Sequence, residues 1–129
     1  MSGLTSCAIS ESCMRREAAF LADIVSAADE LIAASNGLER DSFFADPLRW
    51  RGGLQLLMEI GEAASRLPDE FRHRHPEGAW GKAAGMRNRI VHRYWDLDWD
   101  VLWSTIQTDV PELRAVAAAI LDSEYPPET

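Results

Sequence analysis

The sequence predicts an all-α protein on three observations. Several segments carry apolar residues at three- and four-residue spacing, which is typical of amphipathic helices. No segment alternates apolar and polar residues as a strand does, and Pro or Gly residues separate the helical segments. The 129 residues, 47% apolar and 26% charged, suit one globular domain. We expect a four-helix bundle with one or two additional short helices.

The first long helix is predicted over residues 16–34, where apolar side chains recur with the helical period. Asn36 and Gly37 follow this segment and should end the helix. A short second helix is then expected over about 38–44.

The third helix should begin at Pro47, with Asp46 as its N-cap, and extend to about Leu67. It contains three glycines, which lower helix propensity by about 1 kcal/mol each but often mark a close approach of two helices: Gly52, Gly53 and Gly61.

The second half of the chain continues this pattern. Residues 69–75 are expected to form one or two helical turns before a break over 76–78. A helix over 80–94 follows. Asp98 can cap the last helix, which we expect to kink at Pro111.

The domain is expected over residues 14–122, between a flexible leader over 1–13 and a tail over 123–129. The two cysteines, Cys7 and Cys13, suit free thiols in a reducing cytoplasm, with a local disulfide as the alternative. No apolar run approaches the ~20 residues that cross a bilayer, and no signal-peptide pattern is present. We therefore expect a cytoplasmic protein without a membrane segment.

The densest group of chemically useful side chains lies over residues 87–94, where Arg87, His92 and Tyr94 form the pattern Arg-x4-His-x-Tyr. A guanidinium can bind a phosphate through two hydrogen bonds. A histidine can take or give a proton near neutral pH. Those two roles, without a metal, are what RNA cleavage through the 2′-hydroxyl requires.

The string Met-Arg-Asn-Arg-Ile-Val-His-Arg-Tyr over 86–94 resembles the signature of the HEPN superfamily, in particular its HepT-like (DUF86) toxin branch. The segment over 57–63 is similar to the Glu-Ile-Gly-Glu-Ala helix of that family. Trp80 stands before the motif and the segment over 96–106 follows it, as in the family. One departure is Arg93, because this position is commonly glycine in the branch.

The resemblance implies a HEPN-type fold and a metal-independent endoribonuclease, the toxin of a type VII-like HEPN/MNT toxin–antitoxin system. Arg87 and His92 would be the catalytic residues, and no cofactor is expected. Such toxins are usually paired with a minimal nucleotidyltransferase antitoxin that adenylylates the tyrosine of the motif, here Tyr94. The added bulk and negative charge would lie where RNA phosphate should bind. The active cleft of HEPN proteins is generally formed by a homodimer.

The spacing gives an independent reason to expect that dimer. Arg87 and His92 are separated by about 140° around a helix with ~100° per residue, whereas Arg87 and Tyr94 would be nearly eclipsed. One copy cannot easily wrap both catalytic side chains around a phosphate unless the helix end unwinds. Two facing copies can, and the glycine-containing helix over 47–67 is a candidate interface.

The remaining polar residues of the motif have supporting roles in this hypothesis. Asn88 shares a helix face with His92 and would hold it or contact the backbone. Arg89 and Arg93 would bind flanking phosphates of an RNA substrate, either a tRNA or an mRNA. The helix macrodipole favours the protonated form of His92, which is near the C-terminal end of its helix.

The net charge of −8 argues against nucleic-acid binding by the molecule as a whole. Seven of the 13 basic residues, however, fall between positions 66 and 93. This clustering predicts a local basic surface, although a solvated charged face is the alternative. Its members are Arg66, Arg72, Arg74, Lys82, Arg87, Arg89 and Arg93.

Competing interpretations concern metals, tryptophans and catalysis. A metal site at His73, His75 and His92 is disfavoured because the spacing matches no known ligand set. The five tryptophans are most simply core and dimer contacts, with base stacking by Trp95 or Trp99 as the alternative. The alternative function is a noncatalytic helical partner or nucleotide-binding module of a minimal nucleotidyltransferase.

Overall fold

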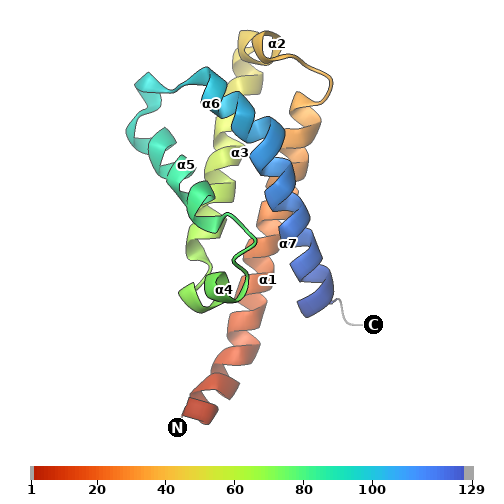
Figure 1. The fold of residues 1–129 in the computed structure, drawn as a ribbon, viewed down its shortest axis with the longest axis vertical. Helices are drawn as coiled ribbons and strands as arrows, with labels where there is room; N and C mark the ends of the chain where they lie inside the picture. Colours follow the sequence, from red (N-terminus) through yellow and green to blue (C-terminus); the bar gives the residue numbers. More distant parts are fainter. Residues whose placement is uncertain (1, 127–129) are drawn as a thin grey trace.

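The computed structural model describes residues 2–126, with side chains at position 12 and from 14 onward. Every regular element in this range is helical and no strand occurs there, which confirms the predicted all-α class. Figure 1 shows the elements as α1 (Ser2–Ser35), α2 (Arg40–Ala45), α3 (Pro47–Arg66), α4 (Asp69–Arg74), α5 (Trp80–His92), the 3₁₀ turn η1 (Tyr94–Asp96), α6 (Trp99–Ser104), the π-helical η2 (Thr105–Asp109) and α7 (Val110–Glu124).

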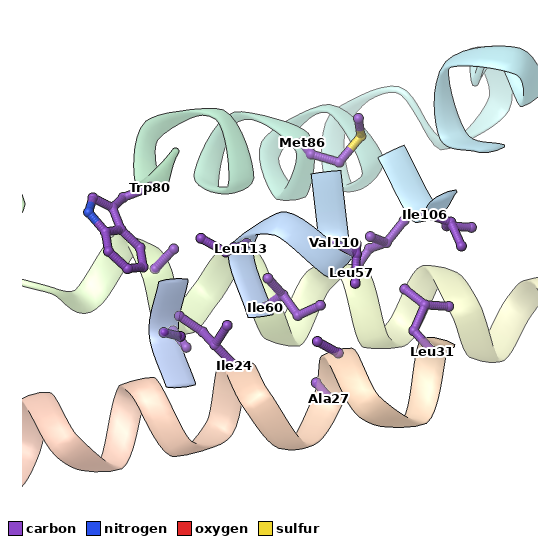
Figure 2. Packing of buried hydrophobic residues seen from close by; sticks show 14 of the residues in the cluster. Ile24, Ala27, Leu31, Leu57, Ile60, Trp80, Met86, Ile106, Val110 and Leu113 are labelled. Carbon is purple, nitrogen blue, oxygen red and sulfur yellow. The ribbon is translucent and has the colours of Figure 1, made fainter. Parts of the chain in front are cut away.

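The four long helical segments form the predicted bundle. α3 packs between α1 and α5, and α7 packs on α1 (Figures 1 and 2). Each segment contributes apolar side chains to one core, among them Ile24, Ile60, Trp80 and Leu113. The short helices α2 and α4 are the two additional ones that the sequence predicted.

The cap signals of the sequence are confirmed. The Asp46 carboxylate accepts hydrogen bonds from the backbone N–H groups of Leu48 and Arg49 at the start of α3. Asp98 caps α6 in the same way. Gly37 adopts a positive φ of 76° just after α1, where a left-handed residue ends the helix.

Residues 2–13, which the sequence assigned to a flexible leader, are helical in the structure. α1 begins at Ser2, and Figure 1 shows its first turns extending past α4 and the end of α7. The segment lacks an amphipathic period, but it contains no proline, and extending an existing helix needs no new nucleation. The side chains of Cys7 and Cys13 lie outside the described residues.

The C-terminal helix accommodates Pro111 by widening in the turn before the proline, and such π-helical turns are themselves sites of helix kinks. Pro111 has no N–H to donate to the carbonyl four residues earlier. The preceding turn, Thr105–Asp109, is π-helical, and the Val110 N–H donates to the Thr105 carbonyl. No described helix is long and apolar enough to span a membrane.

Candidate active site

The helix α5, which holds most of the motif, is fixed to the bundle by its buried face. Trp80, Met86 and Ile90 are buried, and the first two are visible in the core in Figure 2. The Trp80 indole N–H donates to the His75 carbonyl at 2.8 Å, which ties the start of α5 to the end of α4. The position of α5 relative to α3 is therefore set by packing along the whole helix.

Gly61 allows α5 to approach α3 closely beside Arg87. A Cβ at position 61 would lie 2.3 Å from the Arg87 Cβ and 2.7 Å from the Ala83 carbonyl oxygen. Only a glycine fits there without moving one of the helices. By contrast, a Cβ on Gly52 in the same helix would meet no heavy atom within 4 Å. The sequence interpretation that glycines mark close helix approach is thus confirmed at Gly61.

Arg87 lies half-exposed beside this contact and is held by two side chains. Its guanidinium is 3.2 Å from the Glu62 carboxylate and donates to the Asn88 side-chain oxygen at 2.9 Å. Glu62 also accepts a hydrogen bond from Arg66 at 2.8 Å. That hydrogen bond, together with the charges of Arg87 and Arg66, lowers the pKa of Glu62 despite opposing desolvation. Glu62 is therefore ionised at neutral pH and orients Arg87.

The Asn88 side-chain oxygen accepts a hydrogen bond from Arg87. Asn88 therefore holds Arg87 in this structure, whereas the sequence suggested that it holds His92 or contacts the backbone. His92 is exposed and is the last residue of α5. The geometry leaves the His92 imidazole accessible to a substrate.

The expectation that the motif helix continues to residue 94 is wrong. Arg93 is the C-cap of α5, with φ −132° and ψ 37°, and Tyr94 begins the 3₁₀ turn η1. Tyr94 is therefore not eclipsed with Arg87 along one helix. Its side chain is partly exposed, with the Trp95 ring perpendicular to it at a centroid distance of 5.0 Å. The helix end unwinds at this point, which places the phenol in an accessible turn.

Arg89 and Arg93 line a hollow that also includes Asp96 and Val101, on the side of α5 that faces α6. Arg87 instead lines a groove formed with α1 and α3. Arg93 pairs with Asp96 at 3.3 Å. In the described part of the chain, no acidic side chain lies within ion-pair distance of Arg89. Arg93 is therefore paired with an acid, whereas the positive charge of Arg89 has no acidic partner in this part of the chain.

Acidic side chains pair with most members of the predicted local basic surface, which therefore carries less net positive charge than the sequence suggested. Lys82 pairs with Asp109 at 3.1 Å, and Arg74 lies between Glu17 and Glu124. Arg72 does not face solvent as a free cation either; it donates to the backbone carbonyls of Ser65 and Leu67 at the end of α3. Arg66 and Arg87 share Glu62.

The three histidines are used differently. His75 is buried, with Nε2 at 2.6 Å from Glu124 and Nδ1 at 3.3 Å from Glu77. His73 and His92 are exposed. The described side chains contain no group of three or more histidine, cysteine, aspartate or glutamate residues arranged to hold a metal ion.

Sequence reasoning missed Glu62 as a residue of the site. It appeared only as part of the family-like segment over 57–63, without a partner. The signal was the Gly-Glu pair, because a glycine at a close helix approach places the next residue beside the facing helix. In the structure, that neighbour is Arg87.

Comparison with known proteins agrees with this architecture. The family model described as ribonuclease HepT-like matches residues 24–120. A Caldanaerobacter subterraneus subsp. tengcongensis protein named a putative RNase is 33% identical over 111 residues, 86% of this chain and 99% of its own. The protein named probable ribonuclease HepT of Thermococcus cleftensis is 32% identical over 95 residues, 74% of this chain and 86% of its own. No solved structure gives a significant match.

The chain therefore belongs to the HepT-like ribonuclease family of the HEPN superfamily. This result confirms the resemblance drawn from the motif and the surrounding helices. It also supports a ribonuclease function.

Proposed function

We propose that this protein is the toxin of a HEPN/MNT toxin–antitoxin pair and that it cleaves RNA internally without a metal ion. The observation that best supports the proposal is the placement of Arg87 and His92 in the C-terminal half of α5, with a partly exposed Tyr94 in the turn that follows. Arg87 supplies a cation for phosphate, His92 an imidazole for proton transfer, and Tyr94 a phenol that can be modified. The chain that carries these three groups belongs to a ribonuclease family.

In the proposed reaction, a His92 imidazole removes the proton of the ribose 2′-hydroxyl. The 2′-oxygen then attacks the adjacent phosphorus, and the bond from phosphorus to the 5′-oxygen breaks. A protonated His92, the symmetry mate, gives its proton to the leaving 5′-oxygen. Arg87 stabilises the negative charge on the phosphorane. The products are a 2′,3′-cyclic phosphate and a free 5′-hydroxyl.

The site is proposed to form between two copies. Arg87 lines an open groove between α1, α3 and α5, together with the apolar side chains of Phe20, Met58 and Val91. Val91 is one helical turn from Arg87 and half-exposed. A second copy seated on this groove, which Asp23, Glu30, Glu59 and Glu62 also line, would bring the two motifs together across a two-fold axis.

Val91→Glu tests this interface, since burying a carboxylate against the groove should convert a dimer into a monomer. Leu48→Glu is the matched control, because Leu48 is also an exposed apolar residue but does not line the groove. Light scattering measures the mass of each. A dimeric Val91→Glu protein, or a monomeric wild type, would refute the proposed interface.

Tyr94 is the proposed point of control by a cognate nucleotidyltransferase antitoxin. Transfer of AMP from ATP onto the phenol oxygen would release pyrophosphate and add one negative phosphodiester beside His92. Intact-mass measurement after incubation with the partner and ATP should show the AMP mass. Tyr94→Phe should remove it, and an unchanged mass shift in that variant would place the modification elsewhere.

Incubation with total RNA in EDTA tests the enzymatic proposal. We expect cleavage by the wild type and loss of cleavage in His92→Ala and Arg87→Ala, with helix content and thermal midpoint unchanged. Undiminished cleavage in the histidine variant would refute the mechanism. A folded, unmodified dimer that does not cleave would instead favour the noncatalytic partner of a nucleotidyltransferase.

A further inference from the structure

Trp95 differs from the other four tryptophans in its exposure. Trp80 is buried, while Trp50, Trp99 and Trp103 belong to an aromatic cluster with Phe44 and Phe43 from α2. Trp95 is 92% exposed, and Tyr94 provides its one ring contact among the described residues. Trp95 is therefore not a core residue of one copy, which leaves a dimer contact and base stacking as the two sequence interpretations of its indole.

The backbone that presents Trp95 is nevertheless well ordered by hydrogen bonds. The Arg93 N–H donates to the Arg89 carbonyl at 2.8 Å, and the Asp96 N–H donates to the Arg93 carbonyl at 2.9 Å. The Arg93 side chain also pairs with Asp96. A ring on a tied turn loses little conformational entropy when a ligand covers it. The turn thus holds the indole three residues beyond His92.

The acids that follow Trp95 are engaged within the protein, whereas one nearby cation is available to a polyanion. The neighbouring acids are already engaged: Asp96 pairs with Arg93, Asp98 caps α6, and Asp100 lies 2.6 Å from Arg40. The cation of Arg89, one helical turn before Arg93, has no acidic partner in the described part of the chain.

A second surface feature adjoins the indole. Tyr94 lines a hollow with Arg51, Leu54, Met58 and Val91. Met58 and Val91 also line the groove proposed for the second copy, so the Tyr94 phenol and the Arg51 guanidinium are the groups of this hollow that would contact a base and its phosphate. Trp95 contacts the same phenol that lines this hollow, and Tyr94 follows the proposed catalytic histidine by two residues.

From this arrangement we propose that Trp95 is a stacking platform for an unpaired base of the RNA substrate, next to the bond that is cleaved. The inference rests on the proposed ribonuclease function and narrows its substrate to single-stranded segments. A base inside a duplex is stacked on its neighbours and cannot cover the indole, whereas any unpaired base has a face to offer. Trp95 is thus a binding residue and takes no part in proton transfer.

The test uses a fluorescein-labelled, single-stranded 2′-O-methyl oligonucleotide, which binds but cannot be cleaved because its 2′-oxygen carries no proton. Anisotropy should show Trp95→Ala binding it about 10-fold more weakly than the wild type, as expected for loss of one stacked base. Trp95→Phe should recover most of the affinity. Leu48→Ala, which removes an equally exposed apolar side chain (87%), should bind like the wild type.

Cleavage kinetics and the molar mass in solution distinguish a role of Trp95 in RNA binding from a role in dimer formation. With cleavable RNA, Trp95→Ala should raise KM and leave kcat nearly unchanged, and light scattering should show the wild-type assembly. Unchanged affinity in Trp95→Ala while the wild type still cleaves would overturn the stacking role alone. A monomeric Trp95→Ala beside a dimeric wild type would also overturn it, because the ring would then be an interface contact. A wild type that neither binds nor cleaves RNA would refute the ribonuclease proposal as well.

Discussion

Replacing Gly61 with alanine tests whether the α3–α5 contact positions Arg87. The added Cβ would lie 2.3 Å from the Arg87 Cβ, whereas an ordinary contact begins at 3.4 Å, so the helices must separate by about 1.1 Å (3.4 − 2.3). The neighbouring Ala83 carbonyl oxygen, at 2.7 Å, blocks a sideways adjustment. Both obstacles are fixed to the α5 backbone, so the strain cannot be relieved by rotating a flexible side chain.

The magnitude follows from two opposing effects. Alanine in a helix interior is favoured over glycine by about 1 kcal/mol. Overpacking of a well-packed contact costs about 1–3 kcal/mol, or more where backbone must move. We expect Gly61→Ala to lower the free energy of unfolding by up to about 2 kcal/mol net, which lowers the thermal midpoint by up to roughly 10 °C for a domain of this size.

Gly52→Ala is the matched control in the same helix, because its Cβ would meet no heavy atom within 4 Å. It should raise the free energy of unfolding by up to about 1 kcal/mol. Urea unfolding followed by circular dichroism compares the two variants. Gly61→Ala should also lose most ribonuclease activity at temperatures where it is folded, since a displacement of about 1 Å at a catalytic group is costly. Equal stability of the two variants would refute this account of the contact.

Other predictions concern the ion pairs and the end of the bundle. Glu62→Gln should lower the thermal midpoint slightly at pH 7 and should lower kcat, because it removes the carboxylate that orients Arg87; an unchanged kcat would make Glu62 a bystander. Since the ion pairs of Glu62 lower its pKa, they stabilise the fold above its ordinary value of 4.5 and are lost as the pH falls through the lower folded pKa. The fall in thermal midpoint between pH 7 and pH 3 should therefore be smaller in Glu62→Gln than in the wild type, and equal falls would contradict this. Tyr125→Phe should cost about 1–2 kcal/mol at neutral pH, because the phenol donates to the buried Glu17 carboxylate. Burial and that hydrogen bond raise the pKa of Tyr125, so its contribution is fully present below pH 10 and declines as the pH rises further; urea unfolding between pH 7 and pH 11 checks this, and the same decline in Tyr125→Phe would exclude it.

The helices and their caps were predictable because their signals are local. Apolar periodicity identifies a helix, and Asp46 and Asp98 directly precede the segments that they cap. The end of α5 was not predictable in this way. The residue that caps it is Arg93, which lacks the stop signal that a glycine gives. The sequence pattern therefore predicted a helix to Tyr94, whereas the α-helix ends at His92.

The candidate site was predictable in its residues but not in its charges. Arg87, His92 and Tyr94 follow from the motif, yet their surroundings depend on segments far apart in the sequence. Pairing of Lys82 with Asp109, and of Arg74 with Glu17, requires knowledge of how the helices cross. Counting charges along the chain therefore predicted a more basic surface than the ion pairs of the fold leave.

The chemistry of the RNA fragment ends tests the central claim most directly. Wild-type protein is incubated with a defined single-stranded RNA in EDTA, beside His92→Ala, and the fragments are analysed by mass spectrometry. The account predicts 2′,3′-cyclic phosphate and 5′-hydroxyl ends from the wild type, and intact RNA from the variant. Fragments with 5′-phosphate ends, or cyclic phosphate ends produced equally by His92→Ala, would contradict attack by the 2′-oxygen assisted by His92.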